Sequence, residues 1–103
     1  MDIFKRERVN LEDIKPGADL SGRLFIGLDL NFKKIENVNL LGADFLGCSM
    51  IGIDLRNLRL EHSTFEYCNL HEANLEEATI HGSHFRHCDL SGADLLGANK
   101  IIS

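Results

Sequence analysis

The sequence repeats every five residues from position 18 to position 97. Sixteen units follow one another without a gap, and the central residue of each is large and apolar. These central residues are Leu20, Phe25, Leu30, Ile35, Leu40, Phe45, Met50, Leu55, Leu60, Phe65, Leu70, Leu75, Ile80, Phe85, Leu90 and Leu95. In the same register, all nine glycines lie two places after a central position, and all six alanines and three cysteines lie two places before one. So short and regular a repeat predicts a solenoid, in which neighbouring coils bury each other's apolar side chains.

The units resemble the repeat of the pentapeptide repeat proteins, which reads Ala-(Asp/Asn)-Leu-x-x. The clearest matches are Ala18-Asp19-Leu20, Ala43-Asp44-Phe45, Ala73-Asn74-Leu75, Cys88-Asp89-Leu90 and Ala93-Asp94-Leu95. The resemblance implies an all-β fold, a right-handed quadrilateral parallel β-helix, in which four units form one square coil. Sixteen units would give about four coils. We therefore expect an N-terminal cap segment at 1–17, the β-helix at 18–97 and a C-terminal edge at 98–103.

Residues twenty positions apart should stack on adjacent coils, about 4.8 Å apart as in other parallel strands. Phe25, Phe45, Phe65 and Phe85 recur at this interval and are expected to form a column of rings in the core. Cys48, Cys68 and Cys88 form a second column. We interpret these cysteines as small buried apolar residues that replace alanine, because a straight column does not converge as a tetrahedral zinc site requires. A redox or metal role for the three cysteines is the alternative.

Several charged residues follow the same interval or interrupt the repeat. Glu36, Arg56 and Glu76 should lie in one outer column, which predicts weak ion pairs between adjacent coils. In the first coil, Arg23 stands where a small inward residue is usual, and Lys34 stands where Asp or Asn is usual. Such long basic side chains must turn outward to solvent or lie under a cap.

Charge and composition disfavour several classes of function. A net charge of −5 does not suit a nucleic-acid ligand. The sequence has no apolar run long enough to span a membrane and no signal peptide, and its odd number of cysteines favours reduced thiols, so we expect a cytoplasmic protein that makes no membrane contact. The five histidines are scattered in register, and no catalytic motif is present. We expect no enzyme activity, no cofactor and no metal.

The outward positions of the first two coils are apolar, whereas those of the last two are mostly charged. The candidate interface residues are Leu24, Ile26, Phe32, Leu41, Leu46 and Ile51, with Ile101 and Ile102 at the C-terminal edge. An apolar surface of this kind marks an interface or is covered by the protein's own cap. Either residues 1–17 or a partner should therefore cover it. Self-association into a homodimer, through an open coil edge or through the apolar patch, is a further expectation.

These observations favour a rigid, non-enzymatic β-helical scaffold that binds another protein. The resemblance also implies an alternative, because some pentapeptide repeat proteins mimic DNA and act on DNA gyrase. The acidic balance is compatible with this role. However, six of the sixteen acidic residues occupy the consensus Asp/Asn place on different faces and form no continuous stripe.

Overall fold

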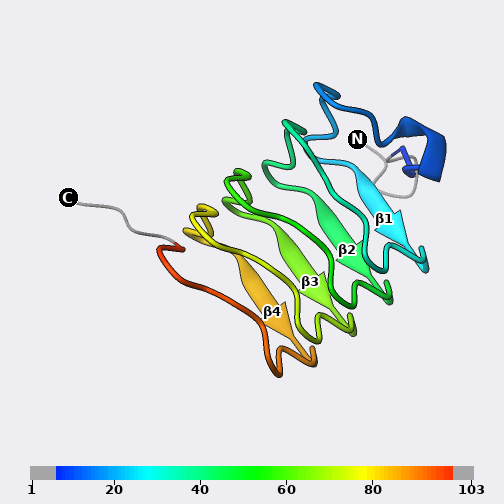
Figure 1. The fold of residues 1–103 in the computed structure, drawn as a ribbon. Coiled ribbons are helices and arrows are strands. Elements are labelled where there is room, and N and C mark those ends of the chain that lie inside the picture. Colours follow the sequence, from blue (N-terminus) through cyan, green and yellow to red (C-terminus); the bar gives the residue numbers. More distant parts are fainter. Residues whose placement is uncertain (1–6, 99–103) are drawn as a thin grey trace.

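The computed structural model describes residues 7–98, and its core is one parallel sheet (Figure 1). The sheet contains β1 (Leu24–Ile26), β2 (Asp44–Leu46), β3 (Thr64–Glu66) and β4 (His84–Arg86), in that order. Each strand pairs with the strand twenty residues later. Isolated parallel bridges at the same interval, such as Asp29↔Ser49 and Lys34↔Asp54, link the coils on other sides. The structure therefore confirms the right-handed quadrilateral β-helix with about four coils, which we number from 18–37, 38–57, 58–77 and 78–97.

The phenylalanine column forms the centre of the fold. The rings of Phe25 and Phe45 stack with centroids 4.2 Å apart, and each later pair stacks at 4.6 Å. Phe25, Phe45 and Phe65 are fully buried, whereas Phe85 is half-buried on the last coil. Stacking of this kind adds about 0.5–1.5 kcal/mol per pair to the burial of the rings. The column therefore holds adjacent coils in register.

The cysteine column lies beside the phenylalanines. The three cysteines are free thiols; Cys48 and Cys68 are buried and Cys88 is half-buried. Each thiol donates to the main-chain oxygen of a phenylalanine on the preceding coil, as Cys48 does to Phe25 at 3.3 Å. Each thiol is thus hydrogen-bonded to the main chain inside the solenoid.

The first coil is closed by residues that precede the repeat. The N–H of Leu24 donates to Glu7 O at 3.2 Å, and the N–H of Val9 donates to Leu24 O at 2.8 Å, so this segment extends the stack beyond β1. Val9 is buried, and a short 3₁₀ helix, η2 (Leu11–Asp13), follows it. Arg23 donates to the main-chain oxygen of Arg8 at 3.0 Å and forms an ion pair with Glu7 at 3.3 Å. The long basic side chain of Arg23 thus binds residues that precede the repeat.

The last coil is much more exposed than the others. Leu95 and Leu96 are 44% and 71% exposed, and Leu90 is only half-buried. Among residues 7–98, β4 is the last strand of the sheet, and its outer edge pairs with no other strand (Figure 1). The apolar side chains of Leu95 and Leu96 are exposed on the same coil. We call this outer side of coil four its rim.

Candidate functional site

The structure brings three of the candidate interface residues together on β1 and β2. Leu24 and Ile26 flank Phe25 on β1, and Ile26 lies opposite Leu46 on β2. All three side chains are half-buried on the outer surface of the sheet. We call Leu24, Ile26 and Leu46 the β1–β2 strip.

Phe32 and Ile51 are neighbours on adjacent coils at a corner of the solenoid. The N–H of Phe32 donates to Ile51 O at 2.8 Å, and the Phe32 ring is 76% exposed. Phe32 has a φ of 60°, a left-handed conformation that glycine adopts at comparable corners. Seven other non-glycine residues share this conformation at the same place in the repeat, so it is the exposure of the Phe32 side chain that marks a candidate functional position.

The other candidate interface residues do not join these sites. Leu41 is 37% exposed and lies before the start of β2, whereas Leu46 lies at its end. Ile101 and Ile102 lie outside the described residues.

The cysteine and histidine side chains do not form a metal site among residues 7–98, where no group of three or more metal-ligating side chains occurs. The His62 and His81 rings lie edge to face with centroids 6.2 Å apart. Burial raises the pKa of the Cys88 thiol. The side-chain hydrogen bond between Cys48 and Cys68 raises the pKa of Cys68 and lowers that of Cys48 to about 7. A raised pKa keeps Cys68 and Cys88 protonated near neutral pH and lowers their reactivity.

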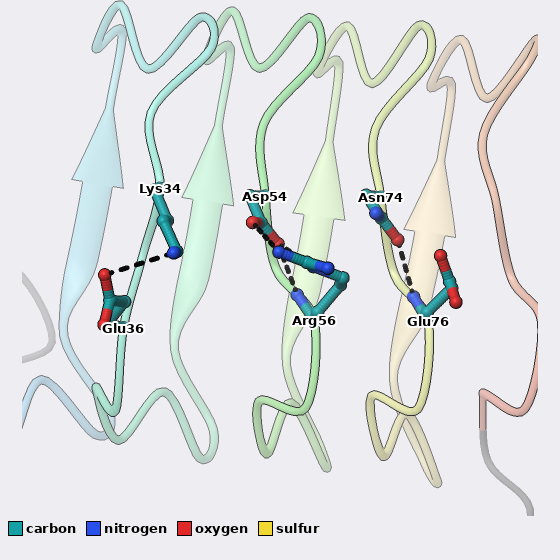
Figure 2. Close-up of polar contacts among 6 residues, drawn as sticks. All are labelled: Lys34, Glu36, Asp54, Arg56, Asn74 and Glu76. Carbon is teal, nitrogen blue, oxygen red and sulfur yellow. Dashed lines mark hydrogen bonds and ion pairs between the residues drawn. The ribbon is translucent and has the colours of Figure 1, made fainter.

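Among residues 7–98, the predicted ion pairs along Glu36, Arg56 and Glu76 do not form, although Glu76 still attracts Arg56 electrostatically. Figure 2 shows that Arg56 pairs with Asp54 of its own coil, at 2.9 Å from Nη2 to Oδ2. The Asp54 carboxylate also accepts the N–H of Arg56, and the side-chain hydrogen bond from Arg56 lowers its pKa. An acceptor two residues away on the same face therefore satisfies Arg56 better than a carboxylate on another coil.

Figure 2 also shows a local difference between the coils. Asp54 and Asn74 each accept the main-chain N–H two residues later, which fixes the turn that follows. Lys34 occupies the same place in coil one, has no acceptor to offer, and instead forms an ion pair with Glu36 at 3.5 Å. Within the described residues, the N–H of Glu36 has no hydrogen-bond partner.

Beyond this turn, the ladder between adjacent coils is interrupted. The N–H of Asn39 donates to Ala18 O at 2.9 Å, and the N–H of Thr79 donates to Leu58 O at 3.0 Å. Arg59 lies between Asn39 and Thr79 in this column, and within residues 7–98 its N–H makes no such hydrogen bond to Val38 O. The bridges Asp19↔Asn39 and Arg59↔Thr79 are present, but Asn39↔Arg59 is not. We call this interruption, in which residues 36–40 face residues 56–59, the seam.

Core volume explains the seam. Val38 and Leu58 are buried at positions that Ala18 and Ala78 occupy in the same column. Two bulky side chains stacked on each other require more room than two alanines, and a close-packed core yields by moving the backbone. The turn from Ile35 to Val38 also lacks the hydrogen bond that closes the turn from Leu55 to Leu58 at 3.3 Å.

A groove of about 880 Å³ lies over the seam. Three cationic side chains (Lys34, Arg56, Arg59) and three acidic ones (Asp19, Glu36, Asp54) line it. This groove was not predicted from the sequence. The signal was present in four departures from the repeat, basic residues in the Asp/Asn place (Lys34, Arg59) and bulky residues in the alanine place (Val38, Leu58).

Comparisons with known proteins agree with this architecture. The model of the pentapeptide repeat region matches residues 38–100. A trypsin-treated variant of QnrB1, a plasmid-mediated fluoroquinolone resistance protein, is 24% identical with a TM-score of 0.58 over 89% of this chain and 44% of that one. The chain thus spans less than half the length of QnrB1, and the similarity shows the fold alone.

Two more distant structures are a pentapeptide repeat protein from the Arabidopsis thaliana thylakoid lumen and HetL from Nostoc sp. strain PCC 7120. The first is 26% identical, with a TM-score of 0.47 over 91% of this chain and 75% of that one. HetL is 21% identical, with a TM-score of 0.40 over 80% of this chain and 46% of that one. The comparison with curated protein sequences gave no significant match. Since the family model covers more than half of the residues, the chain belongs to the pentapeptide repeat family.

Proposed function

We propose that the chain is a rigid, non-enzymatic β-helical module that binds another protein through the apolar residues of its first two coils. The observation that carries this proposal is the exposure of Phe32, a large aromatic residue that is 76% exposed. Exposure forgoes the burial of a large apolar side chain. Contact with a partner would offset this cost.

The β1–β2 strip supports the same proposal. Its column continues from Ile26 and Leu46 to Glu66 and Arg86, so apolar residues give way to charged ones halfway along the stack. Protein interfaces typically have an apolar centre and a polar rim. The non-enzymatic part of the proposal rests on the family, whose members are generally structural or interaction modules.

The experiment compares the proteins that the purified chain captures from cell extract with those captured by variants. Ile26→Glu combined with Leu46→Glu should abolish capture, as should Phe32→Asn, which keeps a residue that tolerates positive φ. The matched control, Glu66→Gln with Arg86→Gln, alters the same column on the next two coils. Capture that both apolar variants retain would refute the proposal, provided that circular dichroism shows them folded.

We also propose the rim of coil four as a surface for self-association. Two features of residues 7–98 support this role: the half-exposed apolar residues of coil four and the edge of β4, which pairs with no other described strand. At the opposite end of the stack, Glu7 and Val9 are hydrogen-bonded to Leu24 of β1. Two copies would therefore meet rim to rim and form a closed dimer rather than a fibre. Light scattering over a range of concentrations should show twice the monomer mass, and a constant monomer mass would exclude this surface.

The alternative, a DNA mimic that acts on gyrase, has weaker support. Asp54 and Glu61 are ion-paired with Arg56 and Arg59, so the negative charge there is neutralised locally. A supercoiling assay with DNA gyrase tests this alternative, and unchanged gyrase activity would exclude it.

The location that we propose is the cytoplasm, and its support is the three free thiols. Among the described residues, no helix is long and apolar enough to cross a membrane. A fluorescent fusion in the native host would test the location directly.

A further inference from the structure

We propose that the seam is a binding groove for an extended segment of a partner polypeptide, which it holds mainly through the main chain. This site is separate from the β1–β2 strip and from Phe32, and the proposal does not depend on them. Four residues that depart from the repeat create the site, and they are grouped on two adjacent coils.

The seam presents main-chain groups that are paired elsewhere in the solenoid. Within residues 7–98, the N–H groups of Asn37, Leu40 and Arg59 have no hydrogen-bond partner, and neither do the carbonyl groups of Val38 and Arg59. The equivalent N–H groups of Leu20 and Leu60 donate to the next coil at 2.9 and 2.8 Å. Polar main-chain groups rarely stay unpaired, so water or a ligand in the groove must satisfy those at the seam.

The mixture of donors and acceptors fits a polypeptide. A peptide main chain alternates N–H and C=O groups, and pairing through them is the general basis of strand addition. The side chains of Asn37 and Asn57 are exposed at the groove, and an amide can donate to and accept from one peptide group. The protein already binds an extended segment in this way, since Glu7 and Val9 hydrogen-bond to the main chain of Leu24.

The charges of the groove argue against an anion or a nucleic acid. Its three cations are each within 3.5 Å of a carboxylate, in the pairs Lys34–Glu36, Arg56–Asp54 and Arg59–Glu61. Phosphate recognition depends on an excess of cationic over acidic side chains, and the residues that line the groove have no such excess. A balanced, polar groove with free main-chain groups therefore favours a neutral peptide main chain as the occupant.

The test uses the whole chain and a phage-displayed library of random peptides. Selected peptides are synthesised, and their affinity is measured by calorimetry while amide exchange is followed by NMR. We expect binding to slow exchange at Leu40 and Arg59. Methylation of alternate peptide nitrogens should weaken binding by about tenfold or more, because it removes main-chain donors.

Two variants that close the seam provide the structural control. Val38→Ala reduces the stacked volume, and Lys34→Asn with Arg59→Asn restores the missing side-chain acceptors. Each should slow exchange at Leu40 and Arg59 in the free protein and weaken peptide binding by about tenfold. The matched control is Ile53→Ala, which also truncates a buried side chain of the core. Beside Ile53 the main-chain bridge between the coils, Lys34↔Asp54, is present, so this variant should leave peptide binding unchanged.

Three outcomes would overturn the proposal. The first is that no selected peptide depends on the seam for its binding. Peptides whose binding is lost in the Ile26→Glu, Leu46→Glu variant, but not in the variants that close the seam, would count as this outcome. The second is unchanged exchange at Arg59 in both closing variants, which would refute the structural cause. The third is a double-stranded DNA oligonucleotide that protects the same amides, which would assign the groove to nucleic acid.

Discussion

The ring of Phe32 lies directly over Gly52 on the next coil, where an added Cβ would come within 2.6 Å of the ring. Gly47, at the preceding corner of the same coil, has open space around the same position. Both glycines have nearly the same φ, 62° and 63°. Comparing an alanine substitution at Gly47 with one at Gly52 therefore distinguishes the cost of backbone strain, which both share, from the cost of steric conflict with Phe32, which only Gly52 has.

We predict that Gly52→Ala lowers the free energy of unfolding by about 1 kcal/mol more than Gly47→Ala. Both variants strain a left-handed backbone, but only Gly52→Ala must displace the exposed ring. Urea denaturation measures both values. In a Phe32→Ala background the difference should vanish, and a difference that persists there would show that Phe32 is not its cause.

The phenylalanine column should be most sensitive in its interior. Phe45→Ala removes a ring stacked on both sides and 1% exposed, so we expect a loss of about 3–5 kcal/mol in the free energy of unfolding. Phe85→Ala removes a half-buried ring with one stacked neighbour and should cost clearly less. Equal losses in urea denaturation would contradict the view that Phe85 is less tightly packed than Phe45.

The cysteines should make stability depend on pH on the alkaline side. The pKa values of Cys68 and Cys88 are raised in the folded state, so folding favours their protonated forms. Their contribution is complete below the unfolded pKa of about 8.5 and decreases as pH rises above it. Denaturation of Cys68→Ala and Cys88→Ala should show a smaller decrease between neutral and alkaline pH than the unmodified chain.

Thiol titration with Ellman's reagent complements this measurement and tests the redox alternative. Cys88 is the only one of the three that is not fully buried, and it should react first. Fast reaction of Cys48 in the native state would contradict a purely structural role for the column.

Asp54 should act mainly as an acceptor for the turn rather than as a charge. Asn74 fills the same place and accepts the N–H of Glu76 at 3.0 Å, so Asp54→Asn should cost about 1 kcal/mol less than Asp54→Ala. The hydrogen bond with Arg56 lowers the pKa of Asp54, so its ionised form stabilises the fold above the unfolded pKa, and this contribution is lost as pH falls through the folded pKa. Acid denaturation of the Asp54→Asn variant should lack this component.

Most of the fold could be predicted from the sequence because the repeat constrains every residue in the same way. The interval between Phe25 and Phe45 gives the coil length, and the apolar central residues give the core. Pairing of charges was predicted less well, since Asp54 and Arg56 interact within one coil through a turn that the column arrangement does not reveal. The hydrogen bonds of Arg56 with Asp54 on the same coil are more favourable than pairing with a carboxylate on an adjacent coil.

The groove could not be predicted because it arises from an interaction between departures from the repeat. From the sequence, Lys34 was interpreted only as a departure within the first coil, and Val38 was not singled out. The main-chain hydrogen bonds between the two coils are lost only where Val38 stacks on Leu58 and where the neighbouring turn has Lys34 in place of a side-chain acceptor. Comparing each residue with its neighbours twenty positions away would have shown the four departures together.

The most direct test of the seam is native-state amide exchange of the free protein, because the seam is defined by particular main-chain hydrogen bonds that are missing. The N–H groups of Leu40 and Arg59 should exchange much faster than those of Leu60 and Thr79, which occupy the same columns and are hydrogen-bonded at 2.8 and 3.0 Å. Equal protection at all four positions would mean that the ladder is continuous and that the seam does not exist in solution.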